Sequence, residues 1–294
     1  MVRSYRAARI AVRAGLLFGM LLTCEAARAE AEIEVKKDIV YGTGAGEELK
    51  LDLAVPKGLE QAAPAVVVIH GGGWMQGKRQ DMADLMKRAA ARGYVAATLS
   101  YRLAPKHRFP AQVEDVKCAV RYLRANAGEL KIVPERIGAI GISAGAHLSM
   151  MLGTLDSEDG MEGDGGHADQ PSKVQAVVSF VGPVNLVRPS YTDIQEQILE
   201  NFFGDKPLNK QADCRRASPL RYVSKGDAPM LLFFGTKDPL IEDDQAYQMS
   251  EALTEAGIPG RVELLVGAEH GWNGPELERT LDASFRFFDE HLKK

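Results

Sequence analysis

Hydrophobic runs alternate with amphipathic stretches from residue 49 to the end of the chain. Residues 49–55 alternate apolar and polar side chains, which predicts a half-buried strand. Residues 65–70 and 94–101 are continuous runs rich in β-branched residues, typical of strands buried in a parallel sheet. Similar apolar runs predict further strands over residues 136–143, 174–182, 229–240 and 261–266.

Between these runs, apolar residues recur at helical spacing. The pattern predicts helices over residues 81–93, 112–126, 144–154, 243–257 and 276–294. Because strands and helices alternate in order, we predict an α/β class with a mostly parallel central sheet and helices on both faces.

Two segments interrupt this alternation. Residues 156–173 are acidic and glycine-rich, which predicts a solvated loop. Residues 185–220 are long for a plain crossover, so we expect an insertion that helps to cover a pocket. No segment has the composition of a linker, and we therefore predict one catalytic domain over residues 30–294 that contains this insertion.

The first 29 residues have the pattern of an export signal. Four arginines precede a short apolar run over residues 14–23, and Ala27 and Ala29 bracket a cleavage pattern. The apolar run is shorter than the roughly 20 residues that span a bilayer, so no stable span is expected after cleavage. We therefore predict a signal peptide over residues 1–29 and a periplasmic or secreted protein.

Composition narrows the possible partners and cofactors. The formal net charge is −4 and the Lys and Arg residues are scattered, which argues against nucleic acid. An exported protein could pair Cys118 with Cys214, but Cys118 lies beside the apolar stripe of a predicted helix, which favours a buried free thiol. No Cys/His pattern indicates a metal, so we expect no metal and no cofactor. The sequence does not determine the oligomeric state.

The sharpest local motif is G-x-S-x-G over residues 141–145, between a predicted strand and a predicted helix. A turn this tight leaves no room for side chains two residues before and after the serine, which explains Gly141 and Gly145. The turn would expose Ser143 above the sheet at the positive end of a helix. We therefore predict that Ser143 is a nucleophile.

A nucleophilic serine needs a histidine base that a carboxylate orients. In this arrangement the acid and then the histidine follow the serine along the chain. His270 lies in a glycine-containing loop after the last predicted strand, and Asp238 follows the preceding strand in the same way. The sequence predicts a Ser143–Asp238–His270 triad, which leaves other roles for His147, His167 and His291 and for Asp243 and Asp244, the latter two expected to begin a helix.

The glycine-rich loop at residues 70–79 has two interpretations. Gly72 to Lys78 spells G-x-x-x-x-G-K, most of a phosphate-binding loop, but Arg79 stands where Ser or Thr would hold Mg²⁺. The alternative is that the HGGG segment, together with the N–H of Ala144, donates to the oxyanion formed in acyl transfer. The downstream triad favours the oxyanion hole.

Five motifs together resemble those of the α/β-hydrolase serine esterases: HGGGW (70–74), SYRLAP (100–105), GISAG (141–145), KDPL (237–240) and EHGW (269–272). The resemblance extends from about residue 35 to the C-terminus. More narrowly, the chain is similar to the hormone-sensitive-lipase-like group and to bacterial acetyl- and feruloyl-esterase-type enzymes. It implies an α/β-hydrolase fold with a small lid-like insertion.

The resemblance also implies roles for individual residues. Gly72 and Gly73 would be the oxyanion donors of the loop, and His70 would brace that loop from beneath. Ile142 and Ala146 replace an acidic residue and a second glycine of the hormone-sensitive-lipase pattern, which favours the carbohydrate-esterase-like neighbours. Trp74 and Trp272 would then border the substrate pocket.

The leading functional hypothesis is a serine carboxylesterase that hydrolyses short-chain acyl esters, with acetyl or feruloyl groups on plant polysaccharide as candidate substrates. One alternative is an amide hydrolase, either arylformamidase-like or a peptidase of the prolyl-oligopeptidase type, although the chain is too short for a gating propeller. Another is an inactive binding protein, which the retained triad and glycine loop disfavour.

Overall fold

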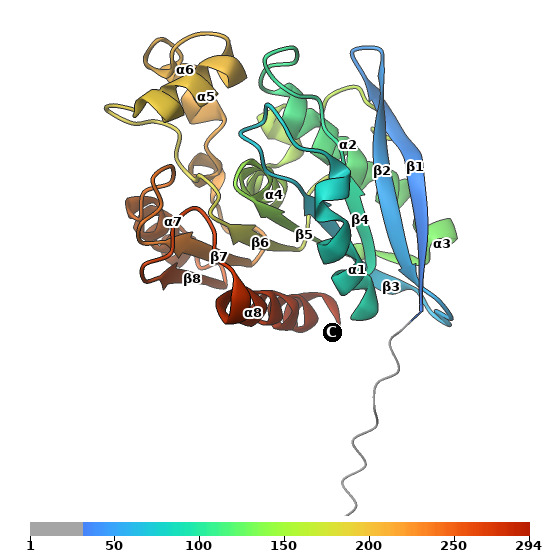
Figure 1. Ribbon diagram of the computed structural model, residues 1–294. Coiled ribbons are helices and arrows are strands. Elements are labelled where there is room, and N and C mark those ends of the chain that lie inside the picture. Colours follow the sequence, from blue (N-terminus) through green and yellow to red (C-terminus); the bar gives the residue numbers. More distant parts are fainter. Residues whose placement is uncertain (1–31) are drawn as a thin grey trace, which may run out of the picture.

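The structure is a computed structural model that describes residues 32–294, and the predicted signal peptide lies outside the described residues. Its centre is an eight-stranded sheet with the order β1-β2-β4-β3-β5-β6-β7-β8 (Figure 1). Strand β2 is antiparallel to β1 and β4, and all other neighbours are parallel. The strands are β1 (Ile33–Gly44), β2 (Glu47–Pro56), β3 (Ala63–Ile69), β4 (Val95–Leu99), β5 (Ile132–Ile142), β6 (Ala176–Phe180), β7 (Met230–Gly235) and β8 (Gly260–Leu265).

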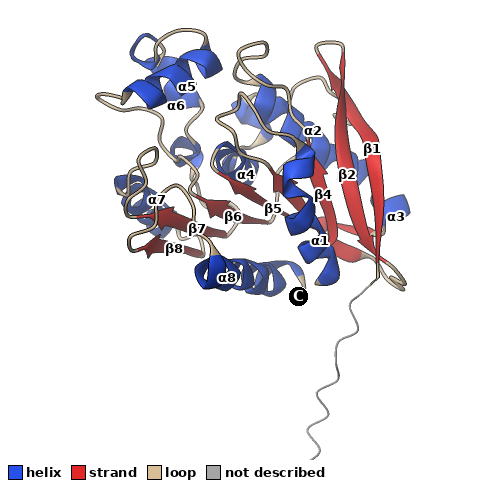
Figure 2. Ribbon diagram, in the orientation of Figure 1, coloured by secondary structure: helices blue, strands red, loops and turns tan. Residues whose placement is uncertain are grey.

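Helices cover both faces of this sheet (Figure 2). They are α1 (Ala83–Ala91), α2 (Ala111–Ala125), α3 (Ala127–Leu130), α4 (Ala144–Thr154), α5 (Asp193–Phe203), α6 (Gln211–Arg216), α7 (Asp244–Ala256) and α8 (Gly274–Leu292). Helices α1 and α8 pack on one face, whereas α2, α4 and α7 pack on the other. Strand β3 supplies both cores because its side chains alternate: Val66 and Val68 point to the α1 side, and Val67 and Ile69 to the α4 side.

The structure confirms the predicted α/β-hydrolase class, the seven predicted strands and the five predicted helices. Strand β1 was not predicted, because it is a half-exposed edge strand with two register shifts and little hydrophobic periodicity. Strand β2 is more buried than its alternation suggested. Its polar position Asp52 is covered and accepts a hydrogen bond from Arg79 Nε at 2.9 Å.

The segment between β6 and β7 contains helices α5 and α6, which form a small layer away from α1 and α8 (Figure 1). None of the helices in residues 32–294 is both long and apolar enough to cross a membrane. Cys118 and Cys214 are both buried and unpaired, as the apolar stripe around Cys118 predicted. Burial raises the pKa of both thiols, which keeps them protonated and unreactive.

Candidate active site

The turn from β5 into α4 exposes Ser143 in a strained backbone conformation. Its φ and ψ are 54° and −120°, outside the regions that most residues adopt. A side chain at Gly145 would come within 3.0 Å of the carbonyl oxygens of Ile69 and His70, and one at Gly141 would clash equally with Gly145. The flanking glycines are therefore required by the backbone around the serine.

The three side chains expected to form a triad lie in one hydrogen-bonded chain. Ser143 Oγ is 2.9 Å from His270 Nε2, and His270 Nδ1 is 2.7 Å from Asp238 Oδ2. Because the carboxylate only accepts, Nδ1 donates to it and Nε2 is left to accept the Ser143 proton. This geometry matches the arrangement predicted for a serine nucleophile, its base and its orienting acid.

Asp238 itself is held rigidly in its turn. Its Oδ1 accepts from the N–H groups of Leu240 and Ile241 at 2.8 and 3.0 Å, and its side chain is fully buried. Asp238 therefore also stabilises its turn, through the carboxylate oxygen that does not face His270. Asp243 and Asp244 lie where they were predicted, at the cap and first residue of α7.

The other histidines lie away from Ser143 Oγ. His147 is buried one helical turn after Ser143, where its Nε2 is 2.6 Å from the Ala217 carbonyl oxygen. The His167 ring packs edge-on against Tyr122, and the His291 ring packs on Phe287 near the C-terminus. His270 is thus the histidine that faces the serine.

The glycine loop approaches the nucleophile with its backbone. Gly72, Gly73 and Trp74 all have positive φ, of 110°, 59° and 60°. Gly73 and Ala144 line the pocket beside Ser143, and the carbonyl of Gly72 accepts from the Met75 and Gln76 N–H groups. The Ser143 N–H donates to the Phe180 carbonyl, whereas Ala144, the first residue of α4, lines the pocket.

His70 braces this loop from within the core. Its Nδ1 donates to the Gly71 carbonyl at 2.8 Å, and its ring stacks on Tyr101 at a centroid distance of 4.3 Å. The Tyr101 hydroxyl donates back to the His70 carbonyl at 3.0 Å. Burial lowers the pKa of His70, so the imidazole is neutral.

The end of the glycine loop is not arranged for phosphate. The guanidinium of Arg79 is engaged by Asp52 and Asp38, and Lys78 stands at the cap of a short 3-10 helix, η1 (Arg79–Met82). No group of three or more His, Cys, Asp or Glu side chains within residues 32–294 could hold a metal ion.

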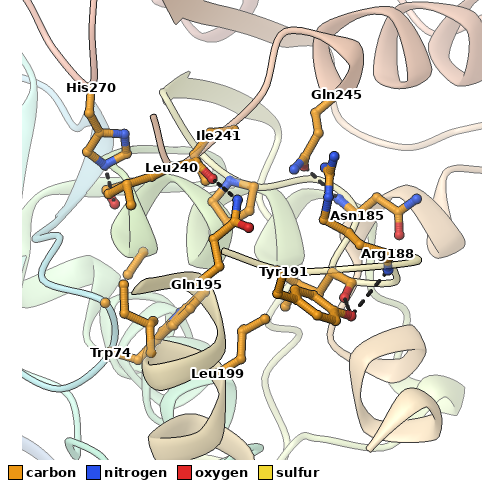
Figure 3. A pocket seen from close by; sticks show the side chains of 16 residues that line it. Trp74, Asn185, Arg188, Tyr191, Gln195, Leu199, Leu240, Ile241, Gln245 and His270 are labelled. Carbon is orange, nitrogen blue, oxygen red and sulfur yellow. Dashed lines mark hydrogen bonds between the residues drawn. The ribbon is translucent and has the colours of Figure 1, made fainter. Parts of the chain in front are cut away.

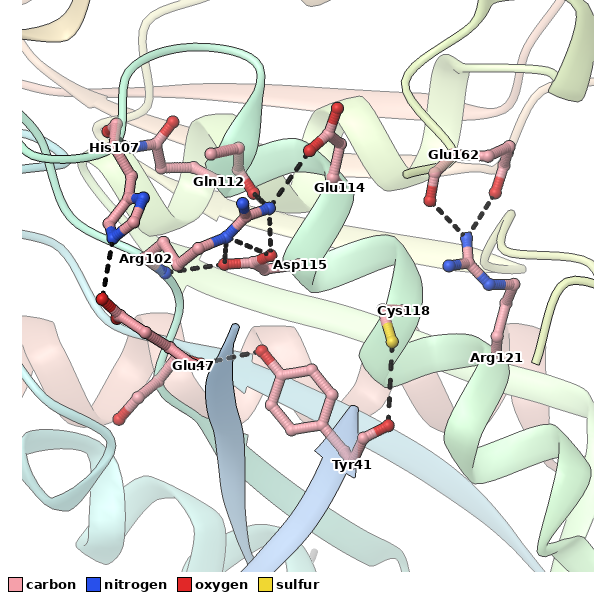
Figure 4. A network of polar contacts seen from close by, with 12 residues as sticks. Tyr41, Glu47, Arg102, His107, Gln112, Glu114, Asp115, Cys118, Arg121 and Glu162 are labelled. Carbon is pink, nitrogen blue, oxygen red and sulfur yellow. Dashed lines mark hydrogen bonds and ion pairs between the residues drawn. The ribbon is translucent and has the colours of Figure 1, made fainter. Parts of the chain in front are cut away.

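A buried ion pair fixes the segment after β4 that supports the loop (Figure 4). Asp115 on α2 accepts from the backbone N–H and the Nε of Arg102 at 2.7 and 2.9 Å, and Glu114 accepts from Arg102 Nη2 at 3.1 Å. From β1, the Tyr41 hydroxyl donates to the Ser100 carbonyl at 2.8 Å. The segment at residues 100–105 is therefore held by α2 and β1. The same segment contacts the glycine loop through Tyr101.

A pocket opens beside Ser143, between the sheet and the 185–220 insertion. In Figure 3, His270 and Trp74 lie on one side of it, and Asn185, Arg188 and Gln245 on the other. Its apolar wall consists of Trp74, Pro183, Leu186, Ile198, Leu199, Leu240 and Ile241.

Most of the polar side chains around the pocket are already engaged. Gln195 accepts from Thr192 N–H and donates to the Leu240 carbonyl. The Tyr191 hydroxyl donates to the Leu186 carbonyl, and the Asn185 amide donates to Gln248. The pocket therefore offers an apolar surface to whatever enters it.

The two tryptophans have different positions. Trp74 lines the pocket, but Trp272 does not: its Nε1 donates to Thr280 Oγ1 at 2.9 Å, and its ring packs against Phe180 and Phe233. The expectation that Trp272 borders the pocket is thus corrected. Its side chain turns toward α8 because the aromatic core and the Thr280 hydroxyl satisfy both its ring and its N–H.

Apart from Trp74, the residues of the pocket wall were not predicted from the sequence, and three of the lining residues, Gln195, Ile198 and Leu199, come from α5. A signal for this helix was present. Thr192 and Gln195 form a capping box, with the Thr192 hydroxyl accepting from the Gln195 N–H and the Gln195 side chain accepting from the Thr192 N–H. The amphipathic run that follows ends at Gly204, a left-handed residue typical of a helix end.

Comparison with known proteins places this site in a family. The BD-FAE family profile matches residues 51–253. The chain belongs to the BD-FAE family. The match includes Ser143 and Asp238 and ends before His270, and the resemblance to the α/β-hydrolase esterases is thereby confirmed.

Individual relatives of this BD-FAE family member are named as esterases. Esterase LipQ of Mycobacterium tuberculosis is 30% identical over 228 residues, which cover 75% of this chain and 53% of LipQ. A probable isoprenylcysteine alpha-carbonyl methylesterase of Arabidopsis thaliana is 26% identical over 246 residues, covering 80% of this chain and 51% of the relative. The chain spans about half the length of the curated relatives it matches.

Solved structures agree over more of their length. A truncated carbohydrate esterase from gut microbiota has a TM-score of 0.77 at 25% identity, covering 90% of this chain and 99% of that one. Esterase 2 of Thermogutta terrifontis with bound propionate has a TM-score of 0.72 at 26% identity, covering 90% and 95%. The fold and the esterase relationship therefore extend across nearly all of the described residues.

Proposed function

We propose that this protein is a serine carboxylesterase that hydrolyses short-chain acyl esters through an acyl-enzyme. The observation that supports this most directly is the hydrogen-bonded chain from Ser143 through His270 to Asp238 beside an apolar pocket. The esterase names of the relatives support the same reaction class.

The geometry suggests the role of each residue. Ser143 Oγ attacks the ester carbonyl while His270 Nε2 takes its proton, and the imidazolium is stabilised by Asp238. The developing oxyanion accepts from the N–H groups of Gly72, Gly73 and Ala144, each such donor being worth about 3 kcal/mol. His270 then protonates the leaving alcohol, and water attacks the acyl-enzyme by the same path in reverse.

The apolar wall favours a hydrocarbon group over a sugar ring in the pocket. We therefore assign the pocket to the acyl group and place the alcohol on the open side of Ser143, where a polysaccharide-linked hydroxyl could leave. Acetyl or feruloyl groups on plant polysaccharide are the proposed natural substrates, and the gut carbohydrate esterase among the similar structures supports that class.

Hydrolysis of p-nitrophenyl acetate by the purified protein tests the reaction. Ser143→Ala is expected to lower kcat by about 10⁴-fold or more, because the nucleophile of a serine triad cannot be replaced by water at comparable rate. Retained activity in this variant would refute the mechanism. Activity on no ester at all would instead favour a binding protein.

A substrate panel separates the finer possibilities. We expect acetylated xylan or methyl ferulate to be hydrolysed with higher kcat/KM than N-formylkynurenine. The opposite preference would support an amide hydrolase of the arylformamidase type.

The proposed compartment is outside the cytoplasm, on the basis of the arginine-rich start and the Ala27 and Ala29 pattern. N-terminal sequencing of the protein from cells that express the full chain tests this proposal. A mature protein that begins at Glu30 supports it, and a protein that retains the first 29 residues in the cytoplasm contradicts it.

A further inference from the structure

His147 is a buried histidine next to the site with no place in the triad. It lies one helical turn after Ser143 and is fully buried. Its Nε2 donates to the Ala217 carbonyl oxygen at 2.6 Å, and its Nδ1 accepts from Trp74 Nε1 at 3.3 Å. A carbonyl oxygen can only accept and an indole N–H can only donate. The ring is therefore the neutral tautomer with its hydrogen on Nε2.

This protonation state is stable over a wide pH range. Burial is the largest influence on His147 and lowers its pKa to about 4. No aspartate, glutamate, lysine or arginine within residues 32–294 forms an ion pair with it. The ring is therefore neutral, and both of its hydrogen bonds are available, at the pH at which a serine esterase works.

Trp74, its partner, ends the glycine loop in a conformation that needs external support. A bulky residue at a φ of 60° is strained and persists only where its surroundings hold it. Its carbonyl accepts from Ala104 N–H at 2.9 Å, and its ring stacks on Phe202 of α5 at a centroid distance of 4.2 Å. The His147 bond is the contact that fixes the indole N–H.

His147 thus joins three segments that are far apart in sequence. It belongs to the helix that follows the nucleophile, it bonds the last residue of the oxyanion loop, and it bonds Ala217 at the end of α6 in the insertion. Trp74 is adjacent to Gly73, which lines the pocket beside Ser143 and is a proposed oxyanion donor. A rotation of the indole would therefore move an oxyanion donor relative to the nucleophile.

We propose that His147 is a positioning residue that sets the oxyanion loop against Ser143 by accepting the Trp74 indole hydrogen bond. This inference rests on the proposed esterase function. Since the oxyanion contact strengthens in the transition state, loss of the His147 acceptor should lower kcat more than it changes KM.

Two substitutions separate the two bonds of the ring. The amide oxygen of Asn occupies the place of Nδ1, so His147→Asn keeps an acceptor for Trp74 and loses the donor to Ala217. The amide nitrogen of Gln reaches the place of Nε2, so His147→Gln keeps the donor and loses the acceptor. Both replacements are buried amides of the same chemistry, so a purely structural role would affect them alike.

Kinetics with p-nitrophenyl acetate provide the first test. We expect His147→Gln to lower kcat by about tenfold with little change in KM, a misplaced donor costing less than a deleted one, and His147→Asn to retain most of the wild-type kcat. Equal losses of kcat in the two variants, no loss in either, or a change confined to KM would overturn the proposal.

Tryptophan emission provides a test that needs no activity. The chain has two tryptophans, so Trp272→Phe leaves Trp74 as the only one. In that background we expect His147→Gln to shift the emission maximum and His147→Asn to preserve it. Identical spectra for all three proteins would contradict the His147–Trp74 bond.

Trp74→Phe removes the donor instead of the acceptor and decides the question if either His147 variant fails to fold. We expect it to lower kcat by about tenfold and to abolish any difference between the Asn and Gln variants. An unchanged kcat in Trp74→Phe would overturn the proposal. If the wild-type protein hydrolysed no ester, the proposed function would fail, while the emission experiment would still test the bond itself.

Discussion

The catalytic side chains and the wall of the pocket are built by different kinds of contact. Ser143, Asp238 and His270 follow strands β5, β7 and β8, so the parallel sheet alone brings them to one edge. The wall from α5 is instead held by side chains, such as the Gln195 amide on the Leu240 carbonyl. Under the proposed function, the reaction chemistry would depend on backbone geometry and substrate selection on the packing of the insertion.

The most direct test of the backbone geometry around Ser143 is Gly145→Ala, which adds one carbon. Its Cβ would collide with two backbone carbonyls of β3 and the loop after it, which cannot move without shifting the sheet. We expect Gly145→Ala to lower kcat by about a hundredfold or more, because a displacement of the nucleophile near 1 Å has that effect. Steady-state kinetics with p-nitrophenyl acetate measures it.

Gly128→Ala is the matched control for this change. A Cβ at Gly128, in the short helix α3, would meet nothing within 4 Å. Activity should stay at the wild-type value there, and stability should not fall, because Ala is a better helix former than Gly. If the two alanine variants behaved alike, the steric explanation of the turn from β5 into α4 would be wrong.

The contact of His147 with the insertion can be tested through the pH dependence of the protein's stability. The pKa of His147 is lowered from 6.5 to about 4 by burial, so the unfolded chain binds this proton at a higher pH than the folded chain does. The stabilisation from a neutral His147 is complete above pH 6.5 and declines as the pH falls toward 4, by roughly 3 kcal/mol in total. Urea unfolding at several pH values measures this loss.

The control for the pH effect is His147→Asn, which cannot take up the proton. Carboxylates protonate in both proteins, so only the difference between the two stability curves reports on His147. We expect the wild type to lose its advantage over the variant as the pH falls. Parallel curves would show that His147 does not titrate between the folded and unfolded states as its burial requires.

The proposed role of the insertion in substrate selection is best tested at Leu199. This buried leucine of α5 lines the acyl pocket, and truncation to Ala would lengthen the available space. We expect the ratio of kcat/KM for p-nitrophenyl hexanoate over acetate to rise by about tenfold, in line with the value of a few methylenes in an apolar pocket. Using a ratio of substrates cancels any change in the folded fraction.

Ile194 provides the comparison on the same helix. Its side chain is 58% exposed and does not line the pocket, so Ile194→Ala should leave the acyl-chain ratio unchanged. A similar change of the ratio in both variants would mean that the insertion as a whole, rather than its pocket-facing residues, sets the preference.

Local sequence patterns were enough to predict the order of strands and helices and the positions after the strands where Ser143, Asp238 and His270 lie. These features follow from local rules: hydrophobic periodicity, the steric need for Gly141 and Gly145, and the meeting of parallel strand ends at one edge. Chain order together with their positions directly after predicted strands selected Asp238 and His270.

Other features depend on contacts between distant segments and could not be predicted from local patterns. Trp272 and Trp74 have similar glycine-containing surroundings in sequence, yet one packs beneath α8 and the other lines the pocket. His147 bonds Trp74 and Ala217 across separations of 73 and 70 residues. Nothing local to any of these residues specifies such a partner, because the direction of a buried side chain is set by whichever segments the fold packs around it.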